Sequence, residues 1–205
     1  QVRYDNRSNR PSREQYRLRY YPSLALTSTW SVNSFIVTGD DFSSSHNTFG
    51  SDTTDYLYAR RLYLRHETNA GKTELGIIPT YKGRVSSTGL SKDGWITGIR
   101  HVRKLQNNTA LEIVVGQLAN AEASEAFNVG EEDEYFEIEY SAKMGERHSY
   151  EASFERMLNG TFARAEYRFR INEEDTAFVE LVQRTDESAA KIVVGTSGEF
   201  TMNAF

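Results

Sequence analysis

The feature that most constrains this chain is a two-residue alternation of apolar and polar side chains. One such run places these residues on a single face: Tyr16, Leu18, Tyr20, Pro22, Leu24 and Leu26. Successive side chains of a β-strand point to opposite faces, so this period predicts strands with one apolar and one polar face. No window keeps apolar residues at i, i+3, i+4 and i+7 over three helical turns. We therefore expect an all-β fold.

Composition restricts the kind of β-protein. Hydrophobic residues make up 38% of the 205 residues and mean hydropathy is −0.62, yet aromatic residues reach 12%. A disordered chain lacks so many aromatic residues, and a helical membrane protein contains apolar runs of about 18 residues. The longest apolar runs in this chain are short pieces such as residues 113–115. A transmembrane β-barrel keeps a low average hydropathy because lipid-facing and lumen-facing residues alternate.

Charge and cysteine content exclude further classes. The net charge is −5, with basic and acidic residues interspersed, so the chain has no electrostatic footprint for nucleic acid. The chain contains no cysteine, which excludes a disulfide scaffold and thiolate metal sites. We predict no nucleic-acid partner.

Turn residues divide the chain into twelve predicted strands. Their approximate ranges are 1–8, 14–28, 30–40, 55–67, 73–85, 94–105, 109–119, 134–143, 148–158, 161–171, 175–184 and 190–200. Short connections alternate with long ones, and the long ones are 41–54, 86–93 and 120–133. Transmembrane β-barrels show this alternation, with short periplasmic turns and longer extracellular loops. Residues 1–205 are therefore predicted to form a single antiparallel up-and-down transmembrane β-barrel with a periplasmic N-terminus and these three loops outside.

The Asn159-Gly160 dipeptide predicts a two-residue hairpin turn, and such a turn determines the register of the two strands beside it. In that register Glu155 faces Arg164 and Glu151 faces Arg168 on the polar side of the hairpin, with apolar partners on the other side. Opposite charges inward and apolar residues outward are the arrangement of a membrane barrel with a polar interior.

Arg60 conflicts with this pattern, because its position in the alternation places it on the lipid face. An Arg at the bilayer midplane of that face costs about 2–4 kcal/mol. We therefore expect either a β-bulge at Arg60-Arg61 or an extension of this strand beyond the membrane. Arg156 is on the same face, within three residues of the Asn159-Gly160 turn, where lipopolysaccharide phosphates could accept it.

The inward positions of the predicted strands define the candidate pore-lining residues. The basic ones are Arg17, Arg19, Arg61, Arg65, Lys82 and Arg100 on the first six strands, and Arg164, Arg168 and Arg170 on the tenth. The acidic ones are Glu112, Glu137, Glu139, Glu151 and Glu155 on the seventh to ninth strands. Opposed basic and acidic walls would produce a transverse field in a narrow pore. The sequence thus predicts a channel for passive diffusion of small polar or charged solutes.

The chain length, the twelve predicted strands, the short first strand and the inward Arg rows together resemble a known family. This is the family of small porins for acidic oligosaccharides in the outer membrane of enterobacteria, the oligogalacturonate and sialic-acid channels. The final alternation of Ile192, Val194, Thr196, Gly198 and Phe200 is similar to the C-terminal strand of bacterial outer-membrane proteins, although five residues follow it here. The resemblance implies a monomer in the bacterial outer membrane that contacts lipid and lipopolysaccharide. It also implies Arg rows that guide a carboxylated sugar, whereas the acidic wall argues against a strong anion preference.

Two other function classes stay open. The first is a plugged structural or adhesive barrel that binds through loops 41–54 and 120–133. The second is an outer-membrane hydrolase, for which the available bases are His46, His66, His101 and His148. None of the four lies in a cluster with metal-ligand spacing, and no Gly-rich phosphate loop occurs. The prediction is therefore not an enzyme, with no catalytic, cofactor-binding or metal-binding residue and no cofactor.

Overall fold

The protein is all-β in the computed structural model, which describes residues 1–38, 47–48, 57–79, 95–119, 134–157 and 159–198. Among these residues no helix is both long and apolar enough to cross a membrane. The strands are β1 (Val2–Arg7), β2 (Arg10–Tyr16), β3 (Arg19–Tyr20), β4 (Ser23–Ala25), β5 (Trp30–Thr38), β6 (Asn47–Thr48), β7 (Leu57–Thr68), β8 (Gly71–Pro79), β9 (Trp95–Lys104), β10 (Thr109–Ala119), β11 (Glu134–Met144), β12 (His148–Met157), β13 (Gly160–Arg170), β14 (Thr176–Arg184) and β15 (Ala189–Ser197).

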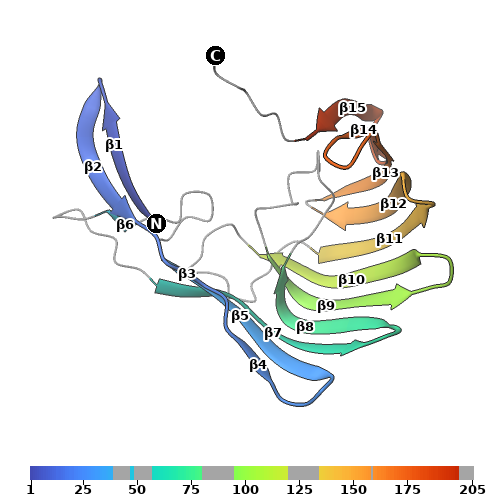
Figure 1. The fold of residues 1–205 in the computed structure, drawn as a ribbon, viewed down its shortest axis with the longest axis horizontal. Coiled ribbons are helices and arrows are strands. Elements are labelled where there is room, and N and C mark those ends of the chain that lie inside the picture. The colour runs from blue at the N-terminus through green and yellow to red at the C-terminus, as the bar shows by residue number, and fades with distance from the viewer. Residues whose placement is uncertain (39–46, 49–56, 80–94, 120–133, 158, 199–205) are drawn as a thin grey trace.

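A 12-stranded antiparallel sheet makes up most of the fold (Figure 1). Its order is β15-β14-β13-β12-β11-β10-β9-β8-β7-β5-β3, and β4 also pairs with β5. A smaller sheet contains β1, β2 and β6, and its β1–β2 hairpin leads directly into β3 (Figure 1). The large sheet curves round, so it has a concave face and a convex face (Figure 1).

The predicted antiparallel meander is confirmed, and each of the twelve predicted segments contains at least one strand. Closure into a barrel is not detected. Among the described residues β15 pairs only with β14 and β1 only with β2, and a gap separates β1 from β15 in Figure 1. The second predicted strand, 14–28, was the least accurate, because the structure begins it at Arg10 and divides it into β2, β3 and β4. Pro22 lies between β3 and β4, where a residue without an N–H cannot donate to the ladder.

Short and long connections alternate along the large sheet from β4 to β11, and the later connections are all short. Short ones join β4 to β5, β7 to β8, β9 to β10, β11 to β12 and β13 to β14 at one end, the short-turn end. The opposite end, the long-loop end, is where β5, β8 and β10 lead into the predicted loops. Loops 86–93 and 120–133 lie outside the described residues, and within 41–54 only β6 is described, where it pairs with β2. The predicted extracellular position of these loops stays a prediction.

The predicted bulge at Arg60-Arg61 is confirmed. Phe35 of β5 pairs with Arg61 of β7, whereas the next residue, Ile36, pairs with Ala59, so Arg60 is the extra residue. Arg60 is 2% exposed. The bulge thus accompanies burial of a charged side chain that the simple alternation would have left on the apolar face.

The predicted register of the β12–β13 hairpin was wrong by two residues. Met157 pairs with Gly160, so the two-residue connection is 158–159 rather than Asn159-Gly160. Asn159 has φ 57°, a left-handed conformation that asparagine accepts, and this lets the turn end one residue earlier. Gly160 begins β13, where an added Cβ would lie 2.9 Å from the Phe162 ring. A shift of two residues leaves every side chain on its predicted face.

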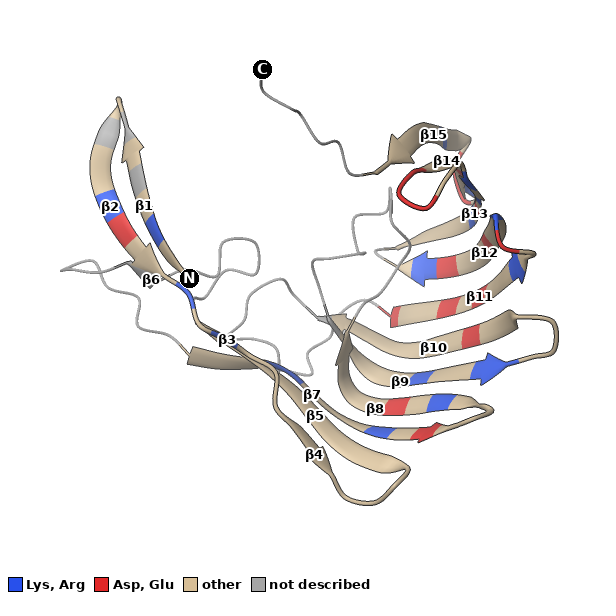
Figure 2. Ribbon diagram, viewed as in Figure 1, with Lys and Arg blue, Asp and Glu red and all other residues tan. Residues whose placement is uncertain are grey.

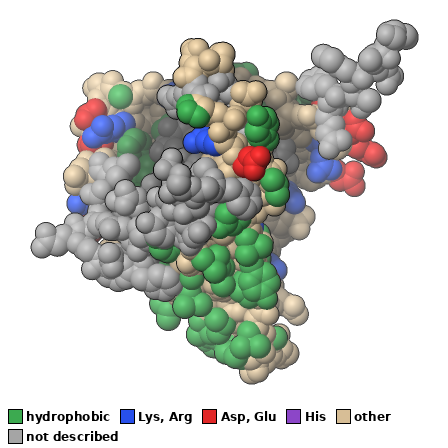
Figure 3. Space-filling view, turned by 90° about the vertical axis from the view of Figure 1, so that its left-hand side faces the viewer, with side chains coloured by type: hydrophobic (Ala, Val, Ile, Leu, Met, Phe, Trp, Pro, Cys, Tyr) green, Lys and Arg blue, Asp and Glu red, His purple; other side chains and the backbone are tan. Residues whose placement is uncertain are grey.

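The two faces of the large sheet are inverted relative to a water-soluble sheet, in which the apolar face is the buried one. Glu74, Glu137 and Glu180 are 0% exposed on the concave face, whereas Ile192 and Val194 on the convex face are 68% and 75% exposed. The exposed large apolar residues of β7 to β15 are Leu57, Leu62, Leu75, Ile99, Ile113, Val115, Phe136, Ile138, Tyr140, Met144, Phe154, Tyr167, Val179, Leu181, Ile192 and Val194. Apolar side chains also gather over the lower part of the molecule in Figure 3, the level at which Figure 1 places β4 and β5.

A row of three glycines crosses the concave face at β8, β9 and β10. Gly76 pairs with Gly98, and Gly98 pairs with Gly116. Tyr63 and Tyr135 are the next partners on either side of the row. Gly76 has φ 127°, which other residues rarely adopt. Glycines let neighbouring strands approach closely on the inner side of a curved sheet, and this row accompanies the curvature.

Substitution of Gly98 by alanine tests this role. An added Cβ would lie 2.2 Å from the Val115 carbonyl oxygen and 2.6 Å from the Gly116 Cα atom, so backbone must move. We expect Gly98→Ala to lower the free energy of unfolding in detergent micelles by about 1–3 kcal/mol, measured by urea titration of tryptophan fluorescence. Thr97→Ala, on the same strand but the opposite face, is the matched control. Equal stability of the two variants would contradict the role of the row.

Candidate functional site

The candidate site is a layer of buried charged side chains across the concave face, here called the charged belt. Its members are Arg65, Glu74, Arg100, Glu112, Glu137, Glu139, Glu151, Glu155, Arg164, Glu166, Arg168 and Glu180. They come from eight consecutive strands, β7 to β14, and Figure 2 shows basic and acidic residues recurring along these strands. The period-two alternation directs them all to one face.

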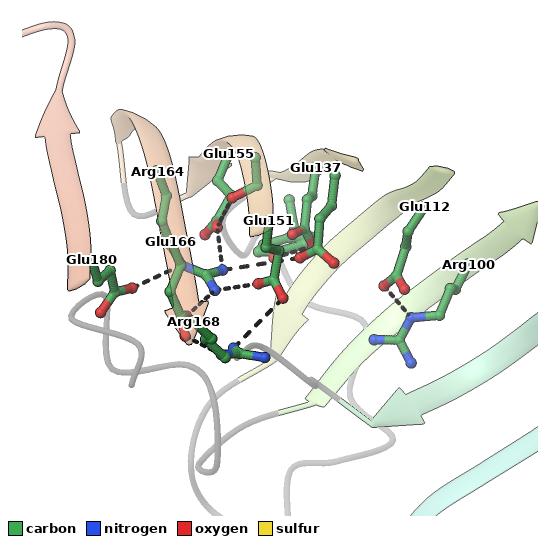
Figure 4. Close-up of polar contacts among 12 residues, drawn as sticks. Arg100, Glu112, Glu137, Glu151, Glu155, Arg164, Glu166, Arg168 and Glu180 are labelled. Carbon is green, nitrogen blue, oxygen red and sulfur yellow. Dashed lines mark hydrogen bonds and ion pairs between the residues drawn. The ribbon is translucent and has the colours of Figure 1, made fainter. Parts of the chain in front are cut away.

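Arg164 is the centre of the belt (Figure 4). Its Nε donates to Glu180 Oε1 at 2.8 Å, and its Nη2 donates to Glu166 Oε2 at 3.3 Å and also to Glu151. Its Nη1 lies 4.0 Å from carboxylate oxygens of both Glu139 and Glu155. Five carboxylates thus surround one guanidinium whose side chain is 1% exposed.

The strand register explains why such a cation is needed. Glu151 pairs directly with Glu166, and Glu166 pairs with Glu180. Two further pairs of direct partners are Glu137 with Glu155 and Glu112 with Glu139. Like charges at directly opposed positions destabilise a sheet, and more so where water is excluded. Arg164 offsets this repulsion for five of the seven carboxylates at once.

A second group of belt residues surrounds Glu74 on β8. Arg65 Nη2 lies 2.7 Å from Glu74 Oε1, and Arg100 Nη1 lies 3.1 Å from Glu74 Oε2. Lys72 Nζ adds a contact at 3.4 Å. Arg100 continues the network, since its Nε lies 2.9 Å from Glu112 Oε1 on β10. Guanidinium groups therefore balance the carboxylate here, whereas carboxylates are in excess around Arg164.

The concave face is layered from end to end. Toward the long-loop end, Ile78, Ile96, Val114, Leu118, Tyr135 and Met157 form a buried apolar cluster. The charged belt lies in the middle. Toward the short-turn end a cavity of about 590 Å³ opens, lined by residues of β9 to β13 that include Lys104, Lys143, Ser149 and the belt residues Glu151 and Arg168.

Most of the predicted pore-lining residues come together on this face. Nine of them belong to the belt: Arg65, Arg100, Glu112, Glu137, Glu139, Glu151, Glu155, Arg164 and Arg168. Arg61 lies beside the belt on β7, with its guanidinium carbon 5.4 Å from the Phe35 ring centre, and Arg170 lines a second, smaller cavity at the short-turn end.

The other three predicted residues lie neither in the belt nor beside it. Arg17 donates to the Gln1 side chain between β2 and β3, and Arg19 lies on β3 at the far edge of the sheet. Lys82 lies outside the described residues.

The sequence interpretation missed two belt residues, Glu166 and Glu180, and did not select Glu74 as a candidate. Glu166 lies between Arg164 and Arg168 in the same alternation, so its face was predictable from residues already chosen. The predicted ion pairs did form, although not between direct partners. Arg168 Nη2 lies 3.7 Å from Glu151, and Arg164 Nη1 lies 4.0 Å from Glu155. Both are diagonal contacts, since Arg164 pairs with Ser153 and Arg168 with Ser149.

The histidines considered for a hydrolase do not contact the belt. The His101 and Thr73 side chains are hydrogen-bonded at 2.9 Å, His148 and Tyr167 at 2.6 Å, and His66 stacks on Trp30 with ring centres 4.5 Å apart. His46 lies outside the described residues. Within the described part of the chain, no group of three or more His, Asp or Glu residues could hold a metal ion.

Comparison with known proteins adds no family. No protein-family model matches this chain, and no curated protein is significantly similar to it in sequence. The two faces of the sheet and the belt are therefore the features from which a function can be inferred.

Arg164→Met tests whether the belt depends on this one cation. Removing the partner of buried charges costs about 3–5 kcal/mol, and here it would leave five neighbouring carboxylates to repel one another. Arg156→Met is the matched control, because Arg156 is 64% exposed and its contact with Glu134 measures 3.9 Å; its loss should be below about 1 kcal/mol. Urea unfolding in micelles would measure both, and equal losses would contradict the central role of Arg164.

Proposed function

We propose that this chain is a bacterial outer-membrane β-barrel that lets small polar or charged solutes diffuse through a polar lumen. The observation that carries the proposal is the inversion of the sheet, with apolar side chains exposed on the convex face and charged side chains buried on the concave face. A barrel in a bilayer requires this inversion, because its outside contacts lipid and its inside contacts water or polar side chains.

Energetics support the membrane assignment. Full burial of a large apolar side chain is worth about 1.5–3 kcal/mol, and β7 to β15 leave sixteen such side chains at least one-third exposed. Monomeric soluble proteins rarely expose so extended an apolar surface. Contact with lipid would recover that free energy, whereas in water it would favour aggregation.

Aromatic side chains near the short-turn end also support it. Trp30 at the start of β5 stacks on His66 near the end of β7. Farther along the sheet, the Tyr140 and Tyr150 ring centres lie 6.0 Å apart, and His148, which is hydrogen-bonded to Tyr167, lies 5.2 Å from Phe169. Aromatic residues collect at the level of the lipid headgroups in membrane barrels.

The proposed closure joins β1 to β15. If β2, β3 and β4 count as one interrupted strand and β6 is set aside, the chain crosses the sheet twelve times, so β1 and β15 would meet antiparallel. The first twenty residues contain six arginines and only two acidic residues. Closure would therefore place a basic wall opposite the carboxylate-rich side of the belt, which has the complementary charge.

Disulfide crosslinking tests the closure. The sequence contains no cysteine, so only the introduced cysteines can form a disulfide. Tyr4→Cys on β1 would be combined with Cys at Ile192, Val194 or Thr196 on β15, because these positions are exposed. We expect one of the three pairs to crosslink under mild oxidation in a bilayer, since a disulfide forms only when the Cα atoms lie within about 7 Å. The pair of Tyr4→Cys with Leu75→Cys on β8 is the control. Failure of all three β15 pairs would exclude this closure.

Conductance in a planar bilayer tests the channel. We expect discrete current steps, with ion selectivity obtained from the reversal potential under a salt gradient. Arg168→Gln removes a positive charge where the cavity meets the belt, so the reversal potential should shift toward cation preference. Arg156→Gln, whose side chain is 64% exposed, is the control and should not change it. An unchanged reversal potential in Arg168→Gln would show that the current does not pass the belt.

A filled, non-conducting barrel is the second candidate. The observation that favours it is the layering of the concave face, where the apolar cluster closes the long-loop side and Arg164 is 1% exposed. Insertion into the bilayer without current steps would favour this candidate over the channel, and function would then reside at the ends of the barrel.

A further inference from the structure

Two adjoining cavities open at the short-turn end of the concave face. One has a volume of about 590 Å³ and the other of about 260 Å³. Lys143, Ser149 and Arg168 line both, so the cavities are contiguous. The larger volume is within the range of small-molecule sites, about 300–1,000 Å³, and the smaller is just below it.

Basic side chains outnumber acidic ones around these cavities, although Glu151 and Glu166 line the larger one and Glu146 lines the smaller one. Lys104 lines the larger cavity, Lys143 lines both, and Arg147 and Arg170 line the smaller one. Within the described part of the chain, none of these four forms a salt bridge. The carboxylates on the belt side of the larger cavity are already paired, since Glu151 and Glu166 both contact Arg164 and Arg168. In the described part of the chain, the larger cavity is therefore lined by lysines without a salt-bridge partner and by glutamates that are already paired.

Neutral donors lie between the cations. Lys143 pairs with Ser149, and Ser149 pairs with Arg168, so one hydroxyl is flanked by two cations at cross-strand distances of about 5 Å. In the neighbouring row Lys104 pairs with Ala110, Ala110 with Ser141, and Ser141 with Glu151. Among the described residues, neither serine hydroxyl makes a hydrogen bond. A hydroxyl donor between two cations, with a second hydroxyl in the next row, is suited to an oxyanion that accepts several hydrogen bonds at once.

We propose that this lysine cavity, defined by Lys104, Lys143, Ser141, Ser149 and Arg168, binds a small solute bearing a phosphate or sulfate group. The lysine ammonium groups supply point charges, the serine hydroxyls supply donors, and Arg168 offers one edge of its guanidinium. The cavity is on the concave face, away from the apolar convex face, so its ligand is a solute rather than a lipid. The site deepens the proposed function by naming what collects at one mouth of the lumen, but binding itself requires no conduction.

Titration of the micelle-refolded protein with inorganic phosphate tests the proposal. Isothermal titration calorimetry at low ionic strength should give saturable binding, sulfate should compete, and chloride at the same ionic strength should not. The double variant Lys104→Gln/Lys143→Gln should weaken phosphate binding at least about tenfold, since two charge-assisted hydrogen bonds are lost. Lys191→Gln, on exposed β15, is the matched control and should bind like wild type.

The outcomes separate this site from the channel. Phosphate binding without bilayer conductance would support the site and reject conduction, whereas conductance without saturable binding would reject the site alone. Circular dichroism would show that the double variant keeps its β-structure, and Lys104→Arg/Lys143→Arg should restore binding to within about threefold because the charges return. Wild-type affinity in the glutamine double variant would overturn the proposal.

Discussion

The interaction of Arg164 with its five carboxylates constrains the rest of the concave face. Alternation decides which face a residue occupies, but every register that differs by two residues preserves that face. Arg164 pairs with Ser153 and contacts both diagonal neighbours, Glu151 and Glu155, so a shift of two residues would bring it opposite one of them and away from the other. The belt therefore selects one register from those that alternation leaves equivalent. Buried polar groups can contribute this kind of specificity even where their net contribution to stability is small.

Alternation and turn residues in the sequence predicted most of the strands, their antiparallel order, the long connections after β5, β8 and β10, and a bulge as one of two explanations for Arg60. These properties are local, since each follows from a few neighbouring residues. The β12–β13 register was not predictable from the Asn159-Gly160 dipeptide, because both residues tolerate a left-handed conformation; Asn159 adopts it, with φ 57°, and Gly160 already belongs to β13. The start of β2 at Arg10 was also missed, since residues 10–13 have the turn-like composition Arg-Pro-Ser-Arg.

The candidate site shows the same division between local and long-range information. Nine of the predicted pore-lining residues belong to the belt, because the two-residue alternation alone was enough to place their side chains on the concave face. The alternation could not show that Glu151, Glu166 and Glu180 are direct partners on three neighbouring strands, because that depends on the registers of two strand pairs. It also could not show the three layers of the concave face, which depend on how far each strand extends past its neighbours. The glycine row adds curvature, which brings the layers of separate strands toward a common axis.

The unpaired outer edge of β15 has a consequence for how such a chain must fold. Its backbone N–H and C=O groups have no partner strand on that side among the described residues, and Ile192 and Val194 stand beside them. An exposed, apolar edge is a template for strand addition by another molecule. During biogenesis this edge would compete for two partners, the first strand of its own chain and any neighbouring chain, and only the intramolecular reaction is independent of concentration. Dilute or chaperoned chains would therefore favour the monomer, whereas crowding of unfinished chains would favour aggregates joined edge to edge.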